Sequence, residues 1–408
     1  MSKHDPEEAL QSVRREFGEH GGVTPSISRS STFTVLEPGA MPEIFAGVRG
    51  PDQGGCFLYS RQFNPTVDVL GRYLAAMEGT ESAICTASGM SAIACAILQC
   101  VHSGGHIVSS DTVYGGSHAL LEDLLPELGI RTTFVDITDA EAVQTAITPE
   151  TRVLFTETIG NPTLKVADIS ALSRIARRDG LQLIVDNTFS PIMVSPAVLG
   201  ADVVVYSITK FINGASDLIA GAICGSRSFV RRLMDLHTGR IMLLGPTMDP
   251  RAAFDIIQRL PHLPLRMREH GRRALAISEM LEDLGLAVIY PGLSAHPHHK
   301  RLCSMLNGDY GFGGIFALDC RTLQKAEKML DILQNRKRFG LIAVSLGFFD
   351  TLMSCSGSST ASEISKEDQA KIGLSPGLLR ISIGFTGRLK DRLQQMREAV
   401  SEAGLLNG

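Results

Sequence analysis

The chain has 408 residues, a length that is too great for one small core and that predicts two domains with extensions. Apolar residues make up 44% of it and charged residues 20%, proportions typical of an ordinary globular protein. The formal net charge of −4 and the lack of long runs of like charge argue against a nucleic-acid-binding surface. No apolar run is long enough to span a membrane, and the charged first residues do not predict a signal peptide.

The eight cysteines of the chain form neither a CxxC pair nor a cluster with histidines. A disulfide framework or a Cys/His metal site is therefore not expected. We interpret the cysteines as reduced and mostly buried thiols, as in a protein of the cytoplasm.

The first 62 residues show no regular periodicity and are rich in glycine and proline. We interpret residues 1–62 as an extended arm that carries a long loop and lies against a neighbouring subunit. The arm ends with Tyr59 and Arg61, which are two positions apart, so an extended backbone would point both side chains to one side. A guanidinium beside a phenol can bind a phosphate, although a salt bridge within the loop is an equally good interpretation.

From Pro65 onward, segments with helical spacing alternate with short apolar runs typical of strands. We expect helices at residues 66–77, 92–101, 119–128, 140–147, 169–179 and 226–236, and strands at 81–86, 106–109, 132–135, 152–157, 181–188, 203–205 and 219–224. This alternation predicts an α/β domain over residues 63–262, with a large, mostly parallel seven-stranded sheet covered by helices on both faces. The motifs of dinucleotide-binding folds and P-loops, GxGxxG and GxxxxGK[ST], do not occur.

A different pattern follows, in which strands and helices mix after one long amphipathic helix at residues 265–286. We expect strands at 286–290, 314–318 and 379–383 and helices at 323–333 and 388–402. Residues 263–408 are therefore expected to form a smaller α+β domain packed on the first.

Arg380 stands in the apolar strand at 379–383, where its guanidinium needs an anionic partner. The partner can be the α-carboxylate of a substrate or a carboxylate of the same domain. Ser345, which follows the apolar run 341–344, could supply a hydroxyl at the same place.

Two neighbouring strands of the expected sheet lead into Asp186 and Lys210. Ligands of open α/β sheets bind beyond the carboxyl ends of the strands, so both side chains are expected at one edge. A lysine amine can lose its proton and form an imine with a carbonyl compound, and a carboxylate can pair with a pyridinium nitrogen. We therefore interpret the pair as a site for pyridoxal phosphate (PLP); the alternatives are a solvated surface lysine and an aspartate that caps a helix.

Small residues after the first expected strand provide a candidate phosphate cradle. Ser88, Gly89 and Met90 stand where backbone N–H groups and a helix dipole could hold an anion. Tyr114, after the second strand, could stack on a flat cofactor, and Asn161 follows the fourth strand at the same edge. Each of these signals is weak alone, because many strand-to-helix junctions are rich in small residues.

Six segments occur in an order that is more specific than any one of them: Tyr59-Ser-Arg61, Ser88-Gly-Met90, Tyr114-Gly-Gly, Asn161-Pro, Asp186-Asn-Thr and Ser207-Ile-Thr-Lys210. With them, the chain resembles the Cys/Met-metabolism family of PLP-dependent enzymes (the trans-sulfuration enzymes) over nearly its whole length. Three further segments are most similar to those of plant-type methionine gamma-lyases: Glu16-Phe-Gly-Glu-His-Gly-Gly, Leu243-Leu-Gly-Pro-Thr-Met and Leu352-Met-Ser-Cys-Ser-Gly-Ser-Ser-Thr360.

The resemblance implies the fold of PLP-dependent transferases (fold type I) and a role for each candidate residue. Lys210 would hold PLP as an imine and shuttle protons together with Tyr114, which would stack on the ring, and Asp186 would pair with the pyridinium nitrogen. The phosphate would be bound by Gly89, Met90, Ser207 and Thr209 of one subunit and by Tyr59 and Arg61 of its neighbour. A homodimer would then be the minimum active unit, with a homotetramer expected. The substrate would be held by Asn161, Ser345 and Arg380.

The reaction that the resemblance implies is the γ-elimination of L-methionine or a related sulfur amino acid, giving methanethiol, 2-oxobutanoate and ammonia. The alternatives are γ-replacement on an O-activated homoserine, which forms cystathionine, homocysteine or a carbon–carbon bond, and a non-catalytic relative. Departures from the family pattern leave the side-chain specificity open: Tyr206, Gly116, Phe348-Phe-Asp350, Cys355-Ser356 and Thr386.

Overall fold

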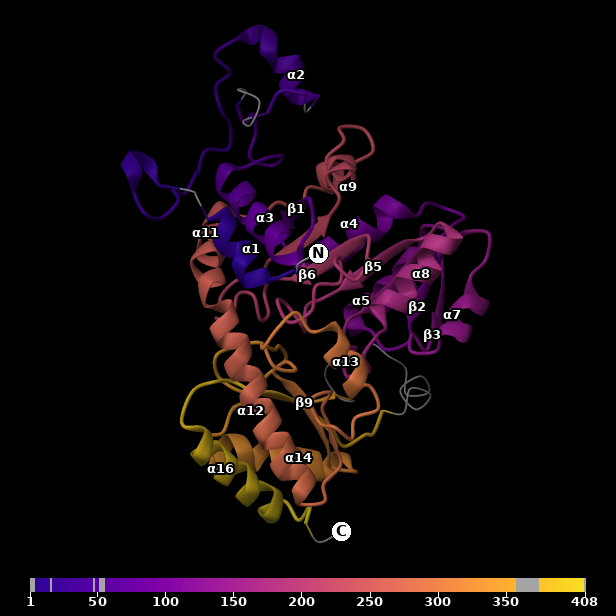
Figure 1. Ribbon diagram of the computed structural model, residues 1–408, viewed down its shortest axis with the longest axis vertical. Coiled ribbons are helices and arrows are strands. Elements are labelled where there is room, and N and C mark those ends of the chain that lie inside the picture. The colour runs from indigo at the N-terminus through magenta and orange to yellow at the C-terminus, as the bar shows by residue number, and fades with distance from the viewer. Residues whose placement is uncertain (1–3, 15–16, 47, 51–55, 357–373, 407–408) are drawn as a thin grey trace.

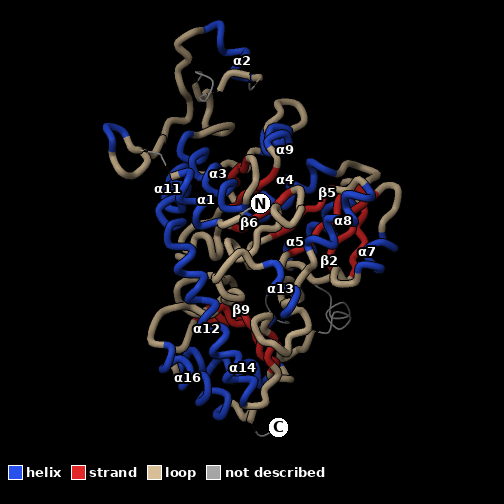
Figure 2. Tube along the Cα trace, in the orientation of Figure 1, coloured by secondary structure: helices blue, strands red, loops and turns tan. Residues whose placement is uncertain are grey.

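The computed structural model describes residues 4–14, 17–46, 48–50, 56–356 and 374–406. The described chain contains a seven-stranded and a five-stranded sheet, which follow each other along the long axis of the molecule (Figure 1). The strands gather in two groups with helices around them, as Figure 2 shows. Within the described residues, no helix is long and apolar enough to cross a membrane.

The larger sheet has the strand order β1-β7-β6-β5-β4-β2-β3. Its strands are β1 (Ser82–Thr86), β2 (His106–Ser110), β3 (Arg131–Val135), β4 (Thr151–Glu157), β5 (Gln182–Asp186), β6 (Val203–Ser207) and β7 (Gly221–Gly225). The strands β2 to β6 pair in parallel, and β7 runs antiparallel to both β1 and β6. The predicted seven-stranded, mostly parallel sheet is confirmed.

Helices cover both faces of this sheet because its central strands are apolar on both sides. In β6, Val204 and Tyr206 belong to one core cluster and Val203 and Val205 to another. The helical elements around the sheet are α3 (Pro65–Glu78), α4 (Gly89–Cys100), α5 (Gly115–Ala119), η4 (Leu120–Leu124), α6 (Leu125–Glu127), α7 (Ala140–Ala146), α8 (Ile169–Asp179), α9 (Arg227–Leu233), α10 (Arg240–Leu244), α11 (Pro250–Arg259) and η5 (Leu260–His262). Since side chains alternate along a strand, Ser207 continues the face that packs on α4.

The limits of α3 follow from its sequence. Asn64 caps the helix by accepting hydrogen bonds from the backbone N–H groups of Thr66 and Val67, and Pro65 occupies the first helical position, where no donor is needed. Gly79 ends the helix with a φ of 80°, a left-handed conformation that glycine adopts without strain.

The smaller sheet has the order β10-β11-β12-β9-β8. Its strands are β8 (Val288–Ile289), β9 (Ile315–Asp319), β10 (Leu341–Ile342), β11 (Leu352–Cys355) and β12 (Leu378–Ser382). The helical elements of this part are α12 (Leu263–Asp283), α13 (His299–Met305), α14 (Leu323–Asp331), η6 (Ile332–Arg336) and α16 (Leu389–Glu402). Figure 1 shows α12 running down one side of the molecule from the larger sheet to the smaller one, as expected for the long amphipathic helix.

The N-terminal segment contains an eight-residue helix that the sequence did not predict, α1 (Pro6–Val13). Asp5 caps it through the backbone N–H groups of Glu7 and Glu8, and the buried Leu10 packs with the core around α3. Eight residues with so few apolar positions are too short to show helical periodicity. Beyond α1, the short elements η1 (Glu19–Gly21), η2 (Pro38–Ala40) and α2 (Met41–Phe45) lie away from the two sheets (Figure 1).

A buried carboxyl group lies where α3 meets β6. Glu78 ends α3 and accepts a hydrogen bond from the Tyr206 hydroxyl and another, of 2.9 Å, from the Ala197 N–H. Asn187 Nδ2 donates to the Tyr206 hydroxyl at 2.9 Å. Burial raises the pKa of Glu78 to about 8, although these hydrogen bonds act in the opposite direction. Tyr206, one of the departures from the family pattern, is thus the donor that satisfies this carboxyl group.

Replacing Glu78 by glutamine should flatten the pH dependence of stability. The pKa of Glu78 is 4.5 in its ordinary state and about 8 in the folded protein. Between these two pH values, Glu78 holds a proton in the folded state that it has released in the unfolded chain. Stability therefore falls as the pH rises. Thermal unfolding midpoints of the wild type and Glu78→Gln at about pH 5.5 and about pH 8.5 test this. An equal drop in both proteins would contradict the assignment.

Candidate active site

The carboxyl ends of β4, β5 and β6 bring the main candidates to one edge of the larger sheet. Asp186 is the last residue of β5, and Ser207 is the last residue of the neighbouring parallel strand β6. Lys210 follows three positions later in a turn. Asp186 and Lys210 thus lie at and just beyond the ends of adjacent parallel strands, as the sequence predicts.

Lys210 is held in a turn that the backbone and α12 stabilise together. Its N–H donates to the Ser207 carbonyl at 3.2 Å, and the Arg266 guanidinium donates to the carbonyls of Phe211 and Ile212. The ammonium group donates to Ser345 Oγ at 2.9 Å. Burial lowers the pKa of Lys210 to about 8, and the nearby charge of Arg380 acts in the same direction. The half-buried amine is therefore partly neutral near pH 8, unlike a solvated surface lysine.

The carboxyl group of Asp186 is only 7% exposed. Its Oδ1 accepts hydrogen bonds from the Thr188 N–H at 2.9 Å and from the Thr188 hydroxyl at 2.5 Å. The Thr188 hydroxyl in turn accepts the Ser207 N–H at 2.8 Å, which links the ends of β5 and β6. Burial raises the pKa of Asp186 to about 6, whereas the Thr188 hydrogen bonds favour the anion. No α-helix begins at this position, so Asp186 is not a helix cap.

The first turn of α4 contains the residues of the predicted phosphate cradle. Ser88 caps the helix, since its hydroxyl accepts the Ser91 N–H at 3.1 Å and the Ser91 hydroxyl accepts the Ser88 N–H. Gly89 lies directly against Ser207: a Cβ atom on Gly89 would be 2.6 Å from the Ser207 Cβ, so only glycine fits. Backbone N–H groups at the positive end of a helix dipole suit a phosphate.

Met90 is the second residue of α4, and Thr209 follows the end of β6. The Met90 sulfur lies 3.3 Å from the position that a Cβ on Gly116 would take, which brings α4 and the start of α5 together. The Thr209 hydroxyl accepts the Ala220 N–H at 3.0 Å and donates to the Ala220 carbonyl at 3.2 Å. The Thr209 hydroxyl is therefore already engaged by the backbone.

Tyr114 begins α5, and its side chain is 43% exposed. A Cβ on Gly116 would lie 2.7 Å from Tyr114 Cε1, so the phenol ring rests on this glycine. The departure at position 116 thus has a steric reason in this chain.

Arg380, on β12, is only 3% exposed. It has no carboxylate partner among the described residues. Its Nη1 donates to Asn161 Oδ1 at 3.2 Å and its Nη2 to the Ser345 carbonyl at 3.1 Å. Burial lowers the pKa of Arg380 to about 10, and the Tyr114 phenol nearby favours its charged form. The alternative of an ion pair within the domain is thus not found, and the guanidinium is available to a carboxylate ligand.

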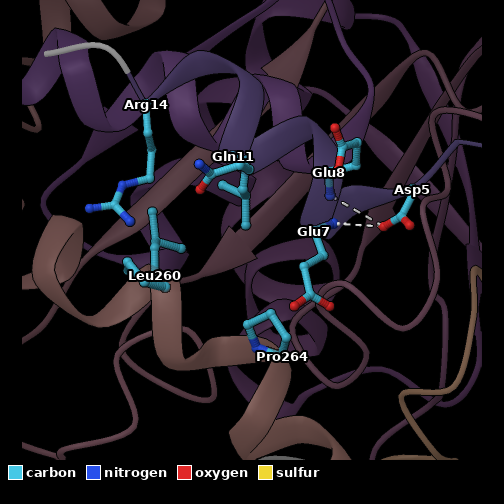
Figure 3. A pocket seen from close by; sticks show the side chains of 9 residues that line it. Asp5, Glu7, Glu8, Gln11, Arg14, Leu260 and Pro264 are labelled. Atoms are coloured by element: carbon cyan, nitrogen blue, oxygen red, sulfur yellow. Dashed lines mark hydrogen bonds between the residues drawn. The ribbon is translucent and has the colours of Figure 1, made fainter.

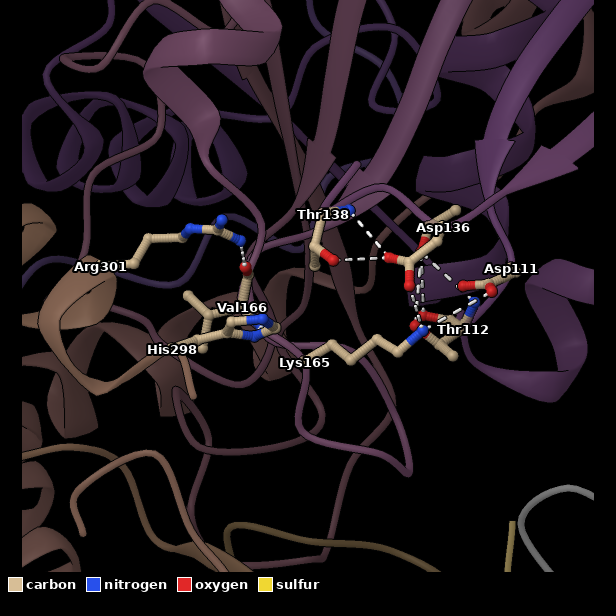
Figure 4. Close-up of polar contacts among 9 residues, drawn as sticks. Asp111, Thr112, Asp136, Thr138, Lys165, Val166, His298 and Arg301 are labelled. Carbon is tan, nitrogen blue, oxygen red and sulfur yellow. Dashed lines mark hydrogen bonds and ion pairs between the residues drawn. The ribbon is translucent and has the colours of Figure 1, made fainter. Parts of the chain in front are cut away.

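The loop between β4 and α8, which carries Asn161, is anchored on two sides (Figure 4). Lys165 Nζ pairs with Asp136 at 2.8 Å, next to β3. From the segment around α13, His298 Nδ1 accepts the Val166 N–H at 3.0 Å and Arg301 donates to the Val166 carbonyl at 2.7 Å. Contacts from the part around the larger sheet and from the part around the smaller sheet therefore set the position of this loop.

Glu157, the last residue of β4, was not singled out from the sequence. It accepts the backbone N–H of Tyr114 at 2.6 Å and that of Asn161 at 2.8 Å. The signal that could have found it is the one used for Asp186, a carboxylate at the end of a predicted strand.

Tyr59 and Arg61 are the predicted site residues that a single chain does not bring to this group. Arg61 donates to the Met242 carbonyl at 2.9 Å, and its guanidinium lies 5.7 Å from the centre of the Tyr59 ring. No described carboxylate pairs with Arg61, so the salt bridge considered from the sequence is not found. No described hydrogen bond joins either residue to Lys210 or Asp186.

A cavity of about 410 Å³ lies elsewhere, between α1 and the start of α12 (Figure 3). Glu7, Glu8, Leu260 and Pro264 are among its lining residues, and none of the candidate site residues is. Groups of three or more side chains that could hold a metal ion are absent from the part of the chain that the structure describes.

The residues around Lys210 fit PLP. An amine, a buried carboxylate on the neighbouring strand and a helix N-terminus with no room for a side chain at Gly89 suit its aldehyde, ring nitrogen and phosphate. Together with the sheet order, this arrangement defines a PLP-dependent enzyme of fold type I.

The comparison with family models gives the finer assignment. The model described as Cys/Met metabolism PLP-dependent enzyme matches residues 8–400. The chain therefore belongs to this family, and its cofactor is PLP.

Named relatives agree with this membership. Methionine gamma-lyase of Arabidopsis thaliana is 54% identical, over 97% of this chain and 90% of the relative. L-methionine gamma-lyase of Fusobacterium nucleatum subsp. polymorphum is 37% identical, over 81% of this chain and 82% of the relative. The crystal structure of cystathionine gamma synthase from Xanthomonas oryzae pv. oryzae, in complex with aminoacrylate and cysteine, aligns with a TM-score of 0.87 at 29% identity over 98% of this chain and 99% of that one.

Replacing Arg380 by methionine should raise the pKa of the Lys210 amine, because it removes a positive charge that disfavours the ammonium form. In protein freed of PLP, the rate at which a small anhydride acylates Lys210 can be followed against pH by mass spectrometry. We expect a midpoint near pH 8 in the wild type and a higher one in Arg380→Met. The exposed Lys328 serves as the reference in each sample. An unchanged midpoint would show that Arg380 does not act on the amine.

Proposed function

We propose that this protein catalyses the γ-elimination of L-methionine, or of a related sulfur amino acid, to methanethiol, 2-oxobutanoate and ammonia. One observation carries the proposal: Lys210 Nζ donates to the Ser345 hydroxyl while Arg380 donates to the Ser345 carbonyl. The Lys210 amine, which can form a covalent bond, and the Arg380 guanidinium, which can bind a carboxylate, thus meet at Ser345. An α-amino acid substrate requires both kinds of group. The 54% identity to methionine gamma-lyase of Arabidopsis thaliana favours methionine within this class.

PLP, when bound, supplies an electron sink that makes the Cα proton of an attached amino acid acidic. Lys210 is the base that takes this proton and returns it, because an amine with a pKa of about 8 exchanges protons readily near neutral pH. Tyr114 covers the cofactor ring, excludes water from one face and assists proton transfer from its phenol.

Each remaining candidate has a binding role in this proposal. Arg380 binds the substrate carboxylate through its two-pronged guanidinium, and Asn161 and Ser345 orient it. Asp186 pairs with the ring nitrogen. The phosphate is held by Ser88, Gly89, Met90, Ser207 and Thr209.

A second copy of the chain completes the site. Tyr59 and Arg61 are solvent-accessible, and no described hydrogen bond joins them to Lys210 or Asp186 in their own chain, so we assign them to the phosphate of a neighbouring subunit. The arm of residues 1–62 exposes large apolar side chains, for example Phe17 at 70% and Leu36 at 91%, as a surface awaiting a protein partner does. A homodimer is then the minimum active unit, and we propose a homotetramer.

All eight cysteines are free, as in a reducing cytoplasm.

The second candidate is γ-replacement on an O-activated homoserine. The likeness to the cystathionine gamma synthase structure favours it. At one of the departures, Asp350 Oδ1 accepts the Thr386 hydroxyl and the Thr351 N–H, each at 2.8 Å. Two departures from the family pattern, Asp350 and Thr386, therefore satisfy each other.

One assay separates the two reactions. The purified, PLP-loaded protein is incubated with L-methionine alone and with O-acetylhomoserine plus a thiol, and 2-oxobutanoate and new amino acids are measured. We expect 2-oxobutanoate from methionine, and at least about a 10²-fold loss in Lys210→Ala, since proton transfer is removed. Absence of keto acid from methionine, with product formed from O-acetylhomoserine, would favour replacement.

Mixing two inactive variants tests whether Arg61 acts across a subunit boundary. Arg61→Ala and Lys210→Ala are co-expressed with different tags, and hybrid oligomers are purified. A hybrid dimer contains one site with both residues intact, so about half of the wild-type activity should return. If Arg61 served its own chain, no site in the hybrid would be complete and activity would stay absent.

A further inference from the structure

The carboxyl group of Glu157 lies between three parts of the active site and is only 6% exposed. It ends β4 in direct register with Asp186 at the end of β5. One oxygen accepts the Tyr114 N–H at 2.6 Å and the other accepts the Asn161 N–H at 2.8 Å. The Glu157 side chain accepts these two hydrogen bonds in the described structure, and both donors belong to candidate site residues.

The two N–H groups belong to separate loops, which follow the paired strands β2 and β4. Tyr114 begins α5 without a side-chain cap, and Asn161 lies in the loop after β4. Asn161 in turn accepts a hydrogen bond from Arg380. One carboxyl group therefore ties the ring-covering tyrosine to the amide that orients the carboxylate-binding guanidinium.

Glu157 also lies beside a second buried acid. Burial, and next the charge of Asp186, raise the pKa of Glu157 well above its ordinary range, although the two backbone N–H groups act in the opposite direction. Thr188 supports the anionic form of Asp186. Two adjacent buried carboxyl groups disfavour each other's ionisation, and the charge of Asp186 therefore acts on Glu157 in the same direction as burial.

We propose that Glu157 is a positioning residue that fixes the backbone of Tyr114 and Asn161 relative to each other. The roles of Tyr114, Asn161 and Asp186 rest on the proposed function. Glu157 itself is not assigned contact with substrate or cofactor.

Two variants test the proposal in the full-length protein. Glu157→Gln keeps the shape but offers one acceptor oxygen instead of two, so one backbone N–H faces an amide N–H₂ group. Glu157→Asp keeps the acid but is one methylene too short to reach both loops. In each, we expect the Kd for PLP and the KM for methionine to rise and kcat to fall, together by about ten- to a hundredfold in kcat/KM. The visible circular dichroism of bound PLP should change because the position of Tyr114 changes.

Glu78→Gln is the matched control. Glu78 is a second fully buried carboxyl group that accepts one backbone N–H, from Ala197, but it bonds to no site residue. Its variant should alter unfolding and leave the Kd for PLP and the dichroism unchanged. If the Glu157 variants behaved in the same way, or failed to fold while Glu78→Gln folded, Glu157 would have a folding role alone and the proposal would be wrong.

The readouts also separate this proposal from the proposed function. PLP affinity and dichroism do not depend on which amino acid is converted. Weakened PLP binding in the Glu157 variants of a protein that does not convert methionine would support the positioning role and contradict the methionine reaction. If the wild type converted methionine and both Glu157 variants bound PLP with unchanged affinity, the proposed function would be supported and the positioning role would be wrong.

Discussion

The hydrogen-bonded register of β4, β5 and β6 fixes the geometry of the active site. In this register Glu157 lies beside Asp186, and the Ser207 N–H reaches Thr188, the residue that holds Asp186. The register is well determined because β6 is buried on both faces, so a slip of one residue would exchange Val203 and Val205 with Val204 and Tyr206 between two different cores. The position of Lys210 follows from the turn that this strand enters.

Residues from the part of the chain around the smaller sheet complete the active site. Arg380 comes from β12 and Ser345 from the segment before β11, yet both contact residues of the larger sheet's loops or of the Lys210 turn. Gly347 permits this approach, since a Cβ there would lie 2.5 Å from the Phe211 nitrogen. The result is that two basic groups, Lys210 and Arg380, meet at Ser345. Burial keeps the lysine amine reactive, and the neighbouring guanidinium reinforces this effect.

The sequence predicted the elements whose signals are local. Strand β5 and helix α8 were found within two residues of their limits, because apolar runs and caps are read along the chain. Asp186 and Lys210 could be placed because parallel strands share one carboxyl edge. Helix α1 was missed because a single buried leucine carries no period. Glu157 was missed because its importance lies in two N–H groups that only the folded loops bring to it.

The central claim is that Lys210 is the amine that binds the cofactor at the strand edge also occupied by Asp186. It is tested most directly by loading the protein with PLP, reducing it with borohydride and mapping the pyridoxyl group by peptide mass spectrometry. The structure predicts one modified position, Lys210. A pyridoxyl group on another lysine, or on none, would contradict the account.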